Sequence, residues 1–129
     1  FAFGKSASSA MAAMVAPGGA LLVTCPTGKV HATERHFGHT THPDVDELDR
    51  LGRGAGLTLE EVRNWGFPTY RLTKWLTNLN PELALRNFAV ERYGPAQVFI
   101  SSALYWANFL NAPSSSEGCQ LFALFRKPR

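Results

Sequence analysis

The sequence predicts an α/β domain, and three observations carry this prediction. A continuous apolar run from Ala20 to Cys25 lies between a glycine turn and Pro26, which is typical of a strand buried on both faces of a parallel sheet. Apolar residues at helical spacing follow from Asp44, and a second apolar run lies near the end of the chain, at Cys119 to Phe125. This order of elements predicts that the first two strands are parallel neighbours joined by a right-handed crossover.

The residues around the first strand predict a short helix before it and a long loop after it. Ser6 to Val15 is rich in Ala, Ser and Met, and a helix there would end at Pro17-Gly18-Gly19. Pro26 to Thr41 has no clear period and, together with His42, carries all four histidines. Long structureless loops in compact domains are usually functional or mobile, so we expect this loop to matter for function.

A helix and a second strand are expected next. His42-Pro43-Asp44 is a good helix start with acids in the first turn, and Gly52 to Gly56 ends the helix. The spacing of these glycines matches nucleotide-binding loops, but such glycines must follow a strand and open a helix, whereas here a helix precedes them. We therefore interpret them as a helix cap and turn. Leu57 to Phe67 alternates imperfectly, with Glu60-Glu61 as an interruption, and predicts the second strand.

Two or three helices are expected between the second strand and the last one. They are predicted around Tyr70 to Leu76, Pro81 to Tyr93 and Pro95 to Leu110, with both prolines in first-turn positions. The third is apolar nearly all round, which predicts that it is buried. Ala112 to Gly118 is a loop rich in Ser, Pro and Gly before the final strand.

Composition excludes several classes of protein. The 129 residues are 45% hydrophobic, enough for one domain with its own core, and 13 Lys and Arg against 10 Asp and Glu give a net charge of only +3. The charges are scattered, so we expect no nucleic-acid partner. The longest apolar stretch, Val98 to Leu110, is shorter than the ~20 residues that span a bilayer, so we expect no membrane partner. Cys25 and Cys119 are expected to be reduced, buried thiols of a cytoplasmic protein.

The histidines leave three interpretations open: a metal site, solvated loop side chains, or catalysis. Their spacing fits no recognisable zinc site, and we expect no metal. A histidine beside the carboxyl end of a parallel strand lies where open α/β sheets bind ligands, and could act as a base. His36 and His39, in the middle of the loop, are best placed. No serine or cysteine has a nucleophile signature.

The aromatic residues are expected to form mostly core, because such side chains dominate burial. Those at the junction from Trp65 to Tyr70 are the exception, since they could instead wall a pocket for a flat or apolar substrate. The aromatic set consists of Trp65, Phe67, Tyr70, Trp75, Phe88, Tyr93, Phe99, Tyr105, Trp106 and Phe109.

Several motifs follow one another in an order that is informative. They are Ala16-Pro17-Gly18-Gly19 before the first strand, Phe37-Gly38-His39, Gly54-Ala55-Gly56-Leu57, Asn64-Trp65-Gly66-Phe67-Pro68-Thr69-Tyr70-Arg71, and Gly118-Cys119 leading through the last strand to Arg126-Lys127-Pro128. In this order they resemble the carboxyl-terminal half of a class I S-adenosylmethionine-dependent methyltransferase, of the small-molecule or lipid-type branch. The likeness runs over nearly the whole chain, and order and spacing carry it, since no motif is specific alone. Where many relatives have G-H-x-R-x-Y, this chain has Gly38-His39-Thr40-Thr41-His42.

This resemblance implies a partial Rossmann-like sheet, strands five to seven of the family, with 69–112 as a helical substrate-side insertion. Residues 1–129 would supply the substrate side of a methyltransferase acting on a small molecule. S-adenosylmethionine would bind through an amino-terminal half whose motifs this sequence lacks, so no cofactor-binding residue is assigned. The implied site residues are His39 and then His36 as the base, with Trp65, Tyr70 and Arg71 binding substrate.

Two features lead us to expect that part of the sheet is supplied elsewhere. The chain opens on Phe1-Ala2-Phe3, and its first strand has the composition of a central strand although the chain supplies few neighbours for it. A missing amino-terminal half or a second chain would then cover the sheet edge. The alternative function is a non-enzymatic, truncated relative that oligomerises and binds an apolar ligand between its helices.

Overall fold

The computed structural model describes residues 5–129, so the expectation about Phe1-Ala2-Phe3 lies outside the described residues. The helices and strands expected from the sequence are each present, with ends that differ by a few residues. In chain order they are α1 (Lys5–Met14), β1 (Ala20–Pro26), α2 (Ala32–His36), α3 (Val45–Gly54), β2 (Thr58–Trp65), α4 (Thr69–Leu79), α5 (Pro81–Phe88), α6 (Pro95–Ala107), the 3-10 helix η1 (Asn108–Leu110) and β3 (Gln120–Arg126).

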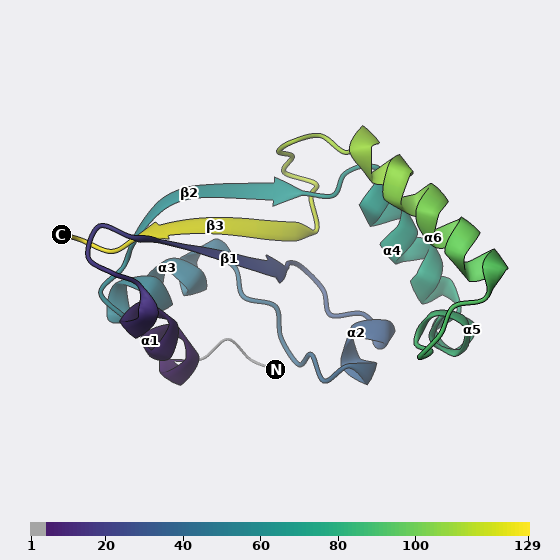
Figure 1. The fold of residues 1–129 in the computed structure, drawn as a ribbon, viewed down its shortest axis with the longest axis horizontal. Helices are drawn as coiled ribbons and strands as arrows, with labels where there is room; N and C mark the ends of the chain where they lie inside the picture. Colours follow the sequence, from purple (N-terminus) through teal and green to yellow (C-terminus); the bar gives the residue numbers. More distant parts are fainter. Residues whose placement is uncertain (1–4) are drawn as a thin grey trace.

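The sheet has the strand order β1-β3-β2, and β3 runs antiparallel to both of its neighbours. Ala123 marks the centre, since it lies opposite Val23 on one side and Val62 on the other. The expectation that β1 and β2 are adjacent parallel strands is therefore wrong. They run in the same direction, but β3 lies between them (Figure 1).

The last strand, not the first, is the central one. Leu121, Ala123 and Phe125 are all buried, whereas Leu22 of β1 is 60% exposed. Of the residues described, only β3 pairs with β1, which is thus an edge strand. Both apolar runs have a composition that suits a central strand, so composition did not reveal which of the two is flanked on both sides.

Strand β2 contains a bulge where the sequence interrupts its alternation. Leu59 pairs with Phe125 and Glu61 pairs with Leu124, so Glu60 is the extra residue. The bulge points the Glu60 carboxylate to the Arg126 guanidinium, with nitrogen-oxygen distances of 3.1 Å. Glu60-Glu61 therefore bends the strand without ending it.

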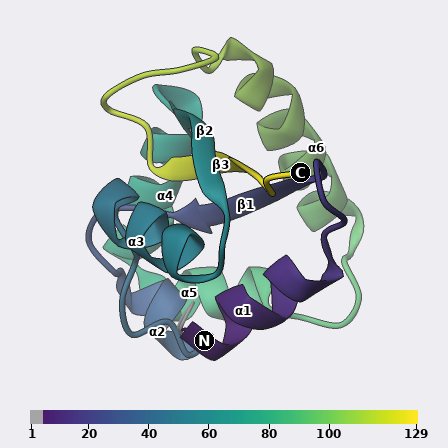
Figure 2. The ribbon, with the colours of Figure 1, turned by 90° about the vertical axis from the view of Figure 1, so that its left-hand side faces the viewer.

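The hydrophobic core lies between one face of the sheet and the two helices α1 and α3, which cover that face (Figures 1 and 2). Leu48 of α3 and Phe125 of β3 are 0% and 1% exposed. Gly52 makes this close packing possible, because a Cβ atom there would lie 2.3 Å from Cε1 of the Phe125 ring. The buried core residues are Ala12, Val23, Leu48, Leu57, Leu121, Ala123 and Phe125.

Helices α4, α5 and α6 form a separate group beyond the carboxyl ends of β1 and β2 (Figure 1). Of the residues that the structure describes, none in these three helices is buried. The expectation that the third helix, 95–110, is buried is wrong: Phe99 is 76% exposed and Trp106 is 69% exposed. Helix α6 is apolar on all sides but lies on the outside of the group, so its outer side chains have no described element against them.

The expectation that the aromatic set forms core is also wrong. Seven of its ten members are exposed, namely Phe67, Trp75, Tyr93, Phe99, Tyr105, Trp106 and Phe109, and the other three are half-buried. Phe125, outside that set, is the largest fully buried side chain among the described residues. Several of the exposed rings pack on one another along α6 and η1, as Trp106 and Phe109 do at 5.5 Å between ring centroids.

The buried amide of Asn111 fastens the start of α4 to the end of η1. Its Oδ1 accepts hydrogen bonds from the backbone N–H groups of Thr69 at 2.9 Å and Tyr70 at 3.2 Å. Its Nδ2 donates to the Asn108 carbonyl at 2.9 Å. These bonds satisfy amides in the first turn of α4 that have no partner within the helix.

Within residues 5–129, no helix has the length and apolar character needed to cross a bilayer.

Candidate functional site

A polar cavity of about 480 Å³ lies where β1 and β2 end and β3 begins. Its wall comes from the loop after β1, from α4 and from the loop that precedes β3. In open α/β sheets, ligands bind outside the carboxyl ends of the strands, so this is the position expected of a site. We call this space the polar cavity; its chemically active lining residues are Lys29, His31, Arg71, Lys74, Glu117 and Cys119.

The loop after β1 is more ordered than the sequence indicated. The expectation of a structureless stretch over 26–41 is wrong in part, because α2 occupies Ala32–His36. The Glu34 carboxylate accepts a hydrogen bond from the His31 N–H at 2.8 Å, which satisfies one amide at the start of this helix. Five residues are too short for an apolar period, so the carboxylate three residues after His31 was the available signal.

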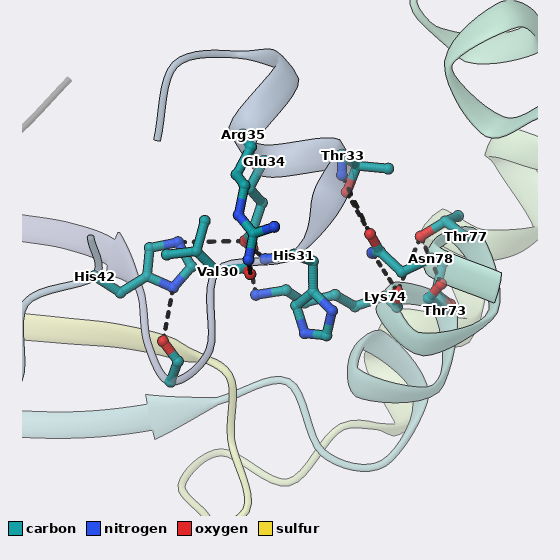
Figure 3. Close-up of polar contacts among 11 residues, drawn as sticks. Val30, His31, Thr33, Glu34, Arg35, His42, Thr73, Lys74, Thr77 and Asn78 are labelled. Carbon is teal, nitrogen blue, oxygen red and sulfur yellow. Dashed lines mark hydrogen bonds and ion pairs between the residues drawn. The ribbon is translucent and has the colours of Figure 1, made fainter. Parts of the chain in front are cut away.

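Glu34 also joins this loop to α4. Its Oε1 lies 2.7 Å from the Lys74 Nζ and 3.5 Å from the His42 Nε2 (Figure 3). The three side chains are well shielded from water, with 16%, 12% and 1% exposure for Glu34, Lys74 and His42. Beside them the Thr33 hydroxyl donates to the Asn78 Oδ1 at 3.0 Å. Loop and helix are thus held together by a partly buried ionic contact and a hydrogen bond.

The environment of His42 restricts where its ring carries protons. Nδ1 lies 3.1 Å from the Gly28 carbonyl oxygen, which can only accept, so Nδ1 carries a hydrogen in this arrangement. Nε2 is buried, has no hydrogen-bond partner, and faces the Glu34 carboxylate. A neutral ring presents a lone pair to that carboxylate, and only the imidazolium form presents an N–H.

Charges around the cavity shift the pKa values of its neighbours. Burial raises the pKa of the Glu34 carboxyl, but hydrogen bonds from His31 and Lys74 and the charges of Lys74 and His42 outweigh it, so the net pKa is lowered. Burial lowers the pKa of His31, and the charges of Lys74 and Lys29 lower it further. Burial raises the pKa of the Cys119 thiol.

The structure separates the two histidines predicted as bases. His36 lies exposed on α2, with its ring 5.2 Å from that of Phe37. His39 is half-buried, its ring lies 5.8 Å from that of His42, and it lines a second cavity of about 580 Å³ between β1 and α1. Neither side chain lines the polar cavity.

The predicted substrate residues are also divided. Arg71 lines the polar cavity and forms an ion pair with Glu117 there. Trp65 lines hollows of about 450 and 440 Å³ away from the polar cavity, the first of them together with Leu22 and Phe122 of the sheet. The Tyr70 ring lies 5.4 Å from that of Trp65, and burial raises its pKa. Both cysteines are free and half-buried.

Sequence reasoning missed Lys29, Glu34 and Lys74, and it did not select His31 or His42 from the four histidines. A signal existed for Lys74, which lies three residues after Arg71 on one face of α4. The sequence held no signal for the roles of Glu34 and His42 beside the polar cavity, because these roles come from contacts between segments distant in the chain.

Comparison with known proteins gives one weak likeness. No family model matches the chain, and no curated protein matches it. A solved structure of Haemonchus contortus phosphoethanolamine N-methyltransferase 2, in complex with S-adenosyl-L-methionine, aligns with 98% of this chain at a TM-score of 0.47 and 17% sequence identity. The aligned region makes up 30% of that protein.

The polar cavity and the cavity beside His39 are poorly matched to S-adenosylmethionine, the cofactor that the sequence resemblance implies. Its sulfonium is a cation, and the polar cavity presents three cations, Lys29, Arg71 and Lys74, against one carboxylate, Glu117. The 580 Å³ cavity beside His39 has no carboxylate in its wall to pair with a cation or to accept hydrogen bonds from ribose hydroxyls. Within residues 5–129, no group of three or more His, Cys, Asp or Glu side chains could hold a metal ion.

Proposed function

We propose that this chain forms the substrate side of an S-adenosylmethionine-dependent methyltransferase acting on a small molecule. The polar cavity is the substrate site in this proposal. The cofactor side is a further stretch of polypeptide that pairs with the free edge of β1, either an amino-terminal half or a second chain. We propose a cytoplasmic location, as expected for a small-molecule enzyme with reduced thiols.

The observation that carries the proposal is the position of the polar cavity at the strand ends. Its volume of about 480 Å³ suits a small molecule. Helix α4, which begins the segment 69–112, forms one wall through Arg71, Lys74 and Trp75. This agrees with the substrate-side role that the sequence resemblance implies for that segment. The cationic lining of the polar cavity suits a substrate better than it suits the cationic sulfonium of the cofactor.

Methyl transfer asks little covalent chemistry of the protein. The reaction is an in-line displacement, so the enzyme holds two reactants in contact and, for a weakly acidic acceptor, removes a proton. In this proposal Arg71 binds the substrate in the polar cavity, and Tyr70 and Trp65 bind parts of the substrate that extend beyond it. His39, which lines the 580 Å³ cavity and not the polar cavity, is the proposed base for an acceptor that extends past the end of β1, and His36, exposed on α2, is the second choice.

The test uses the polypeptide that contains this sequence together with its cofactor-binding part, and measures release of S-adenosylhomocysteine with a panel of small acceptors. We expect acceptor-dependent release that is lost in Arg71→Ala and kept in Arg86→Ala, a matched loss of one exposed cation on α5. Equal release from both variants would overturn the role of the cavity. Micromolar binding of S-adenosylmethionine to residues 1–129 alone would overturn the division between cofactor and substrate sides.

A second candidate is a non-enzymatic relative that binds an apolar ligand between its helices, and one observation favours it. A cavity of about 260 Å³ lies between α2, α5 and α6, lined by Leu85, Phe88 and Leu104 among others. Binding of a neutral fluorescent dye such as Nile red tests it. Ala84→Leu, which would fill this cavity, should abolish binding, whereas Ala96→Leu on the exposed side of α6 should not.

A further inference from the structure

The polar cavity has a surplus of positive charge. Lys29, Arg71 and Lys74 line it, and Glu117 is the carboxylate in its wall. Glu34 lies just behind Lys74 and adds a second negative charge. Three cations against two carboxylates leave one positive charge unbalanced. Within residues 5–129 no ion pair involves Lys29, so the unbalanced positive charge lies at Lys29, in the loop after β1.

The cavity also has hydrogen-bond donors without partners. The Lys74 ammonium has three N–H groups, and the described residues provide one partner, Glu34. Its side chain is only 12% exposed, and it lines the cavity, so the remaining donors are available to a bound group. No hydrogen bond to a described residue uses the His31 ring, which also lines the cavity.

Arg71 is held in place without being fully used. One of its guanidinium nitrogens, Nη1, contacts both the backbone oxygen and the carboxylate of Glu117. The guanidinium carries five donors in a planar fork, so the contact with Glu117 leaves others free. The pair is half-exposed, which makes the Glu117 carboxylate a replaceable counter-ion.

We propose that the polar cavity binds an anionic group, a phosphate or a carboxylate, of the small-molecule substrate. Lys29 and Lys74 provide charge and donors, Arg71 provides a planar fork that suits either oxyanion, and Glu117 gives way as the anion enters. The assignment of this anion to a substrate rests on the proposed function, whereas the binding of an anion does not.

The test is a titration of the ¹⁵N-labelled chain with inorganic phosphate and, separately, with acetate, followed by amide NMR at pH 7. Chloride at matched ionic strength is the reference. We expect saturable shifts of amides in 27–31, 71–75 and 117–119 with at least one of the two oxyanions. Phosphate alone assigns a phosphate site, and acetate alone a carboxylate site. Equal shifts with chloride, or shifts spread over the whole chain, overturn the proposal.

Three variants test the charge assignment. Lys29→Gln, at an exposed position, should weaken anion binding roughly two- to fivefold, and Glu117→Gln should strengthen it roughly as much, as for single exposed charges. The Arg71 contact to the Glu117 backbone oxygen, at 3.2 Å, persists in the second variant. Arg50→Gln removes an exposed cation from α3 and should change nothing. Unchanged affinity in both cavity variants overturns the proposal.

The two proposals fail separately. If the chain binds anions saturably but the complete polypeptide does not turn over the cofactor, the anion site is supported and the methyltransferase proposal fails. If turnover depends on Arg71 but uses only uncharged acceptors, and this chain binds no anion, the anion-site proposal fails and the methyltransferase proposal is supported.

Discussion

The sheet with α1 and α3 and the helical group α4–α6 are stabilised in different ways. In the first region, buried side chains such as Leu48 and Phe125 form a continuous core. In the second, none of the described residues of the three helices is buried, although α6 is strongly apolar. The helical group is held to the rest by polar contacts, notably those of Asn111, Asn78 and Lys74.

This difference indicates which region should lose stability when a residue is substituted and which should tolerate the substitution. Burial of apolar area supplies most of the favourable free energy of folding, so the first region should open only on global unfolding. Regions with few buried apolar contacts open locally at lower free energy. The polar cavity lies at the junction of the two, with one wall on each. The following variants test this contrast.

The largest effect is expected when an aromatic ring is removed from the core. Phe125→Ala should lower the free energy of unfolding by about 3–5 kcal/mol, because the lost ring leaves a cavity beside Gly52 and Leu48. Phe99→Ala, at a 76% exposed position of α6, should change it by less than about 0.5 kcal/mol. Urea unfolding followed by circular dichroism measures both. Similar losses in the two variants would mean that α6 is packed in a way that the structure does not show.

Next in size is the effect of one methyl group in α3. Gly52→Ala should cost about 1–3 kcal/mol of unfolding free energy, because the new Cβ meets the buried Phe125 ring at 2.3 Å. Gly54→Ala on the same helix meets nothing within 4 Å and should be neutral or stabilising, by up to about 1 kcal/mol. Thermal unfolding of both variants separates packing from helix propensity. If Gly52→Ala is as stable as the unaltered chain, α3 can shift away from the sheet at little cost.

A smaller and more local effect is expected at the start of α4. Asn111→Ala removes the acceptor for the Thr69 and Tyr70 amides and should cost about 1–2 kcal/mol, as loss of a helix cap does. Amide hydrogen exchange should speed up in α4 while β3 stays protected. Asn87→Ala, which removes a bond to its own helix at Leu83, is the matched control. Loss of protection in β3 as well would mean that the two regions unfold together.

The parts of the fold that the sequence predicted are those with local causes. Pro81 and Pro95 each begin a helix, and the glycines from Gly52 to Gly56 end α3, because backbone restrictions act within a few residues. Strand order was not predictable in the same way. The run 119–125 pairs with strands far earlier in the chain, and nothing local distinguishes a central strand from an edge strand of equal composition.

The candidate site shows the same limit. Arg71 was selected from its place in a motif, and it does line the polar cavity. Lys74 was not selected although it lies three residues after Arg71 on the same face of α4, and Glu34 was not selected because its role comes from a contact with Lys74, 40 positions away. Burial of α6 was predicted from its composition alone, yet whether an apolar helix is covered depends on what packs against it, which its own sequence does not state.

The smallest effect expected concerns the pH dependence of the junction. Because the pKa of Glu34 is lowered in the folded chain, its ionic contact stabilises the fold fully above the ordinary glutamate pKa of about 4.3 and is lost as the pH falls through the lower, folded-state pKa. The loss should amount to between a few tenths and about 1 kcal/mol, as for a partly exposed ion pair.

Glu34→Gln keeps an acceptor for the His31 N–H and removes the charge, so the unfolding free energy of this variant should fall less between pH 6 and pH 3. Amide hydrogen exchange at Thr33 should report the same loss in the unaltered chain, because the Thr33 N–H donates to the Asn78 side chain across the junction. If the unfolding free energy depends on pH equally in the unaltered chain and in the variant, Glu34 has the same pKa in the folded and unfolded states. The two regions would then be joined by the neutral contacts alone.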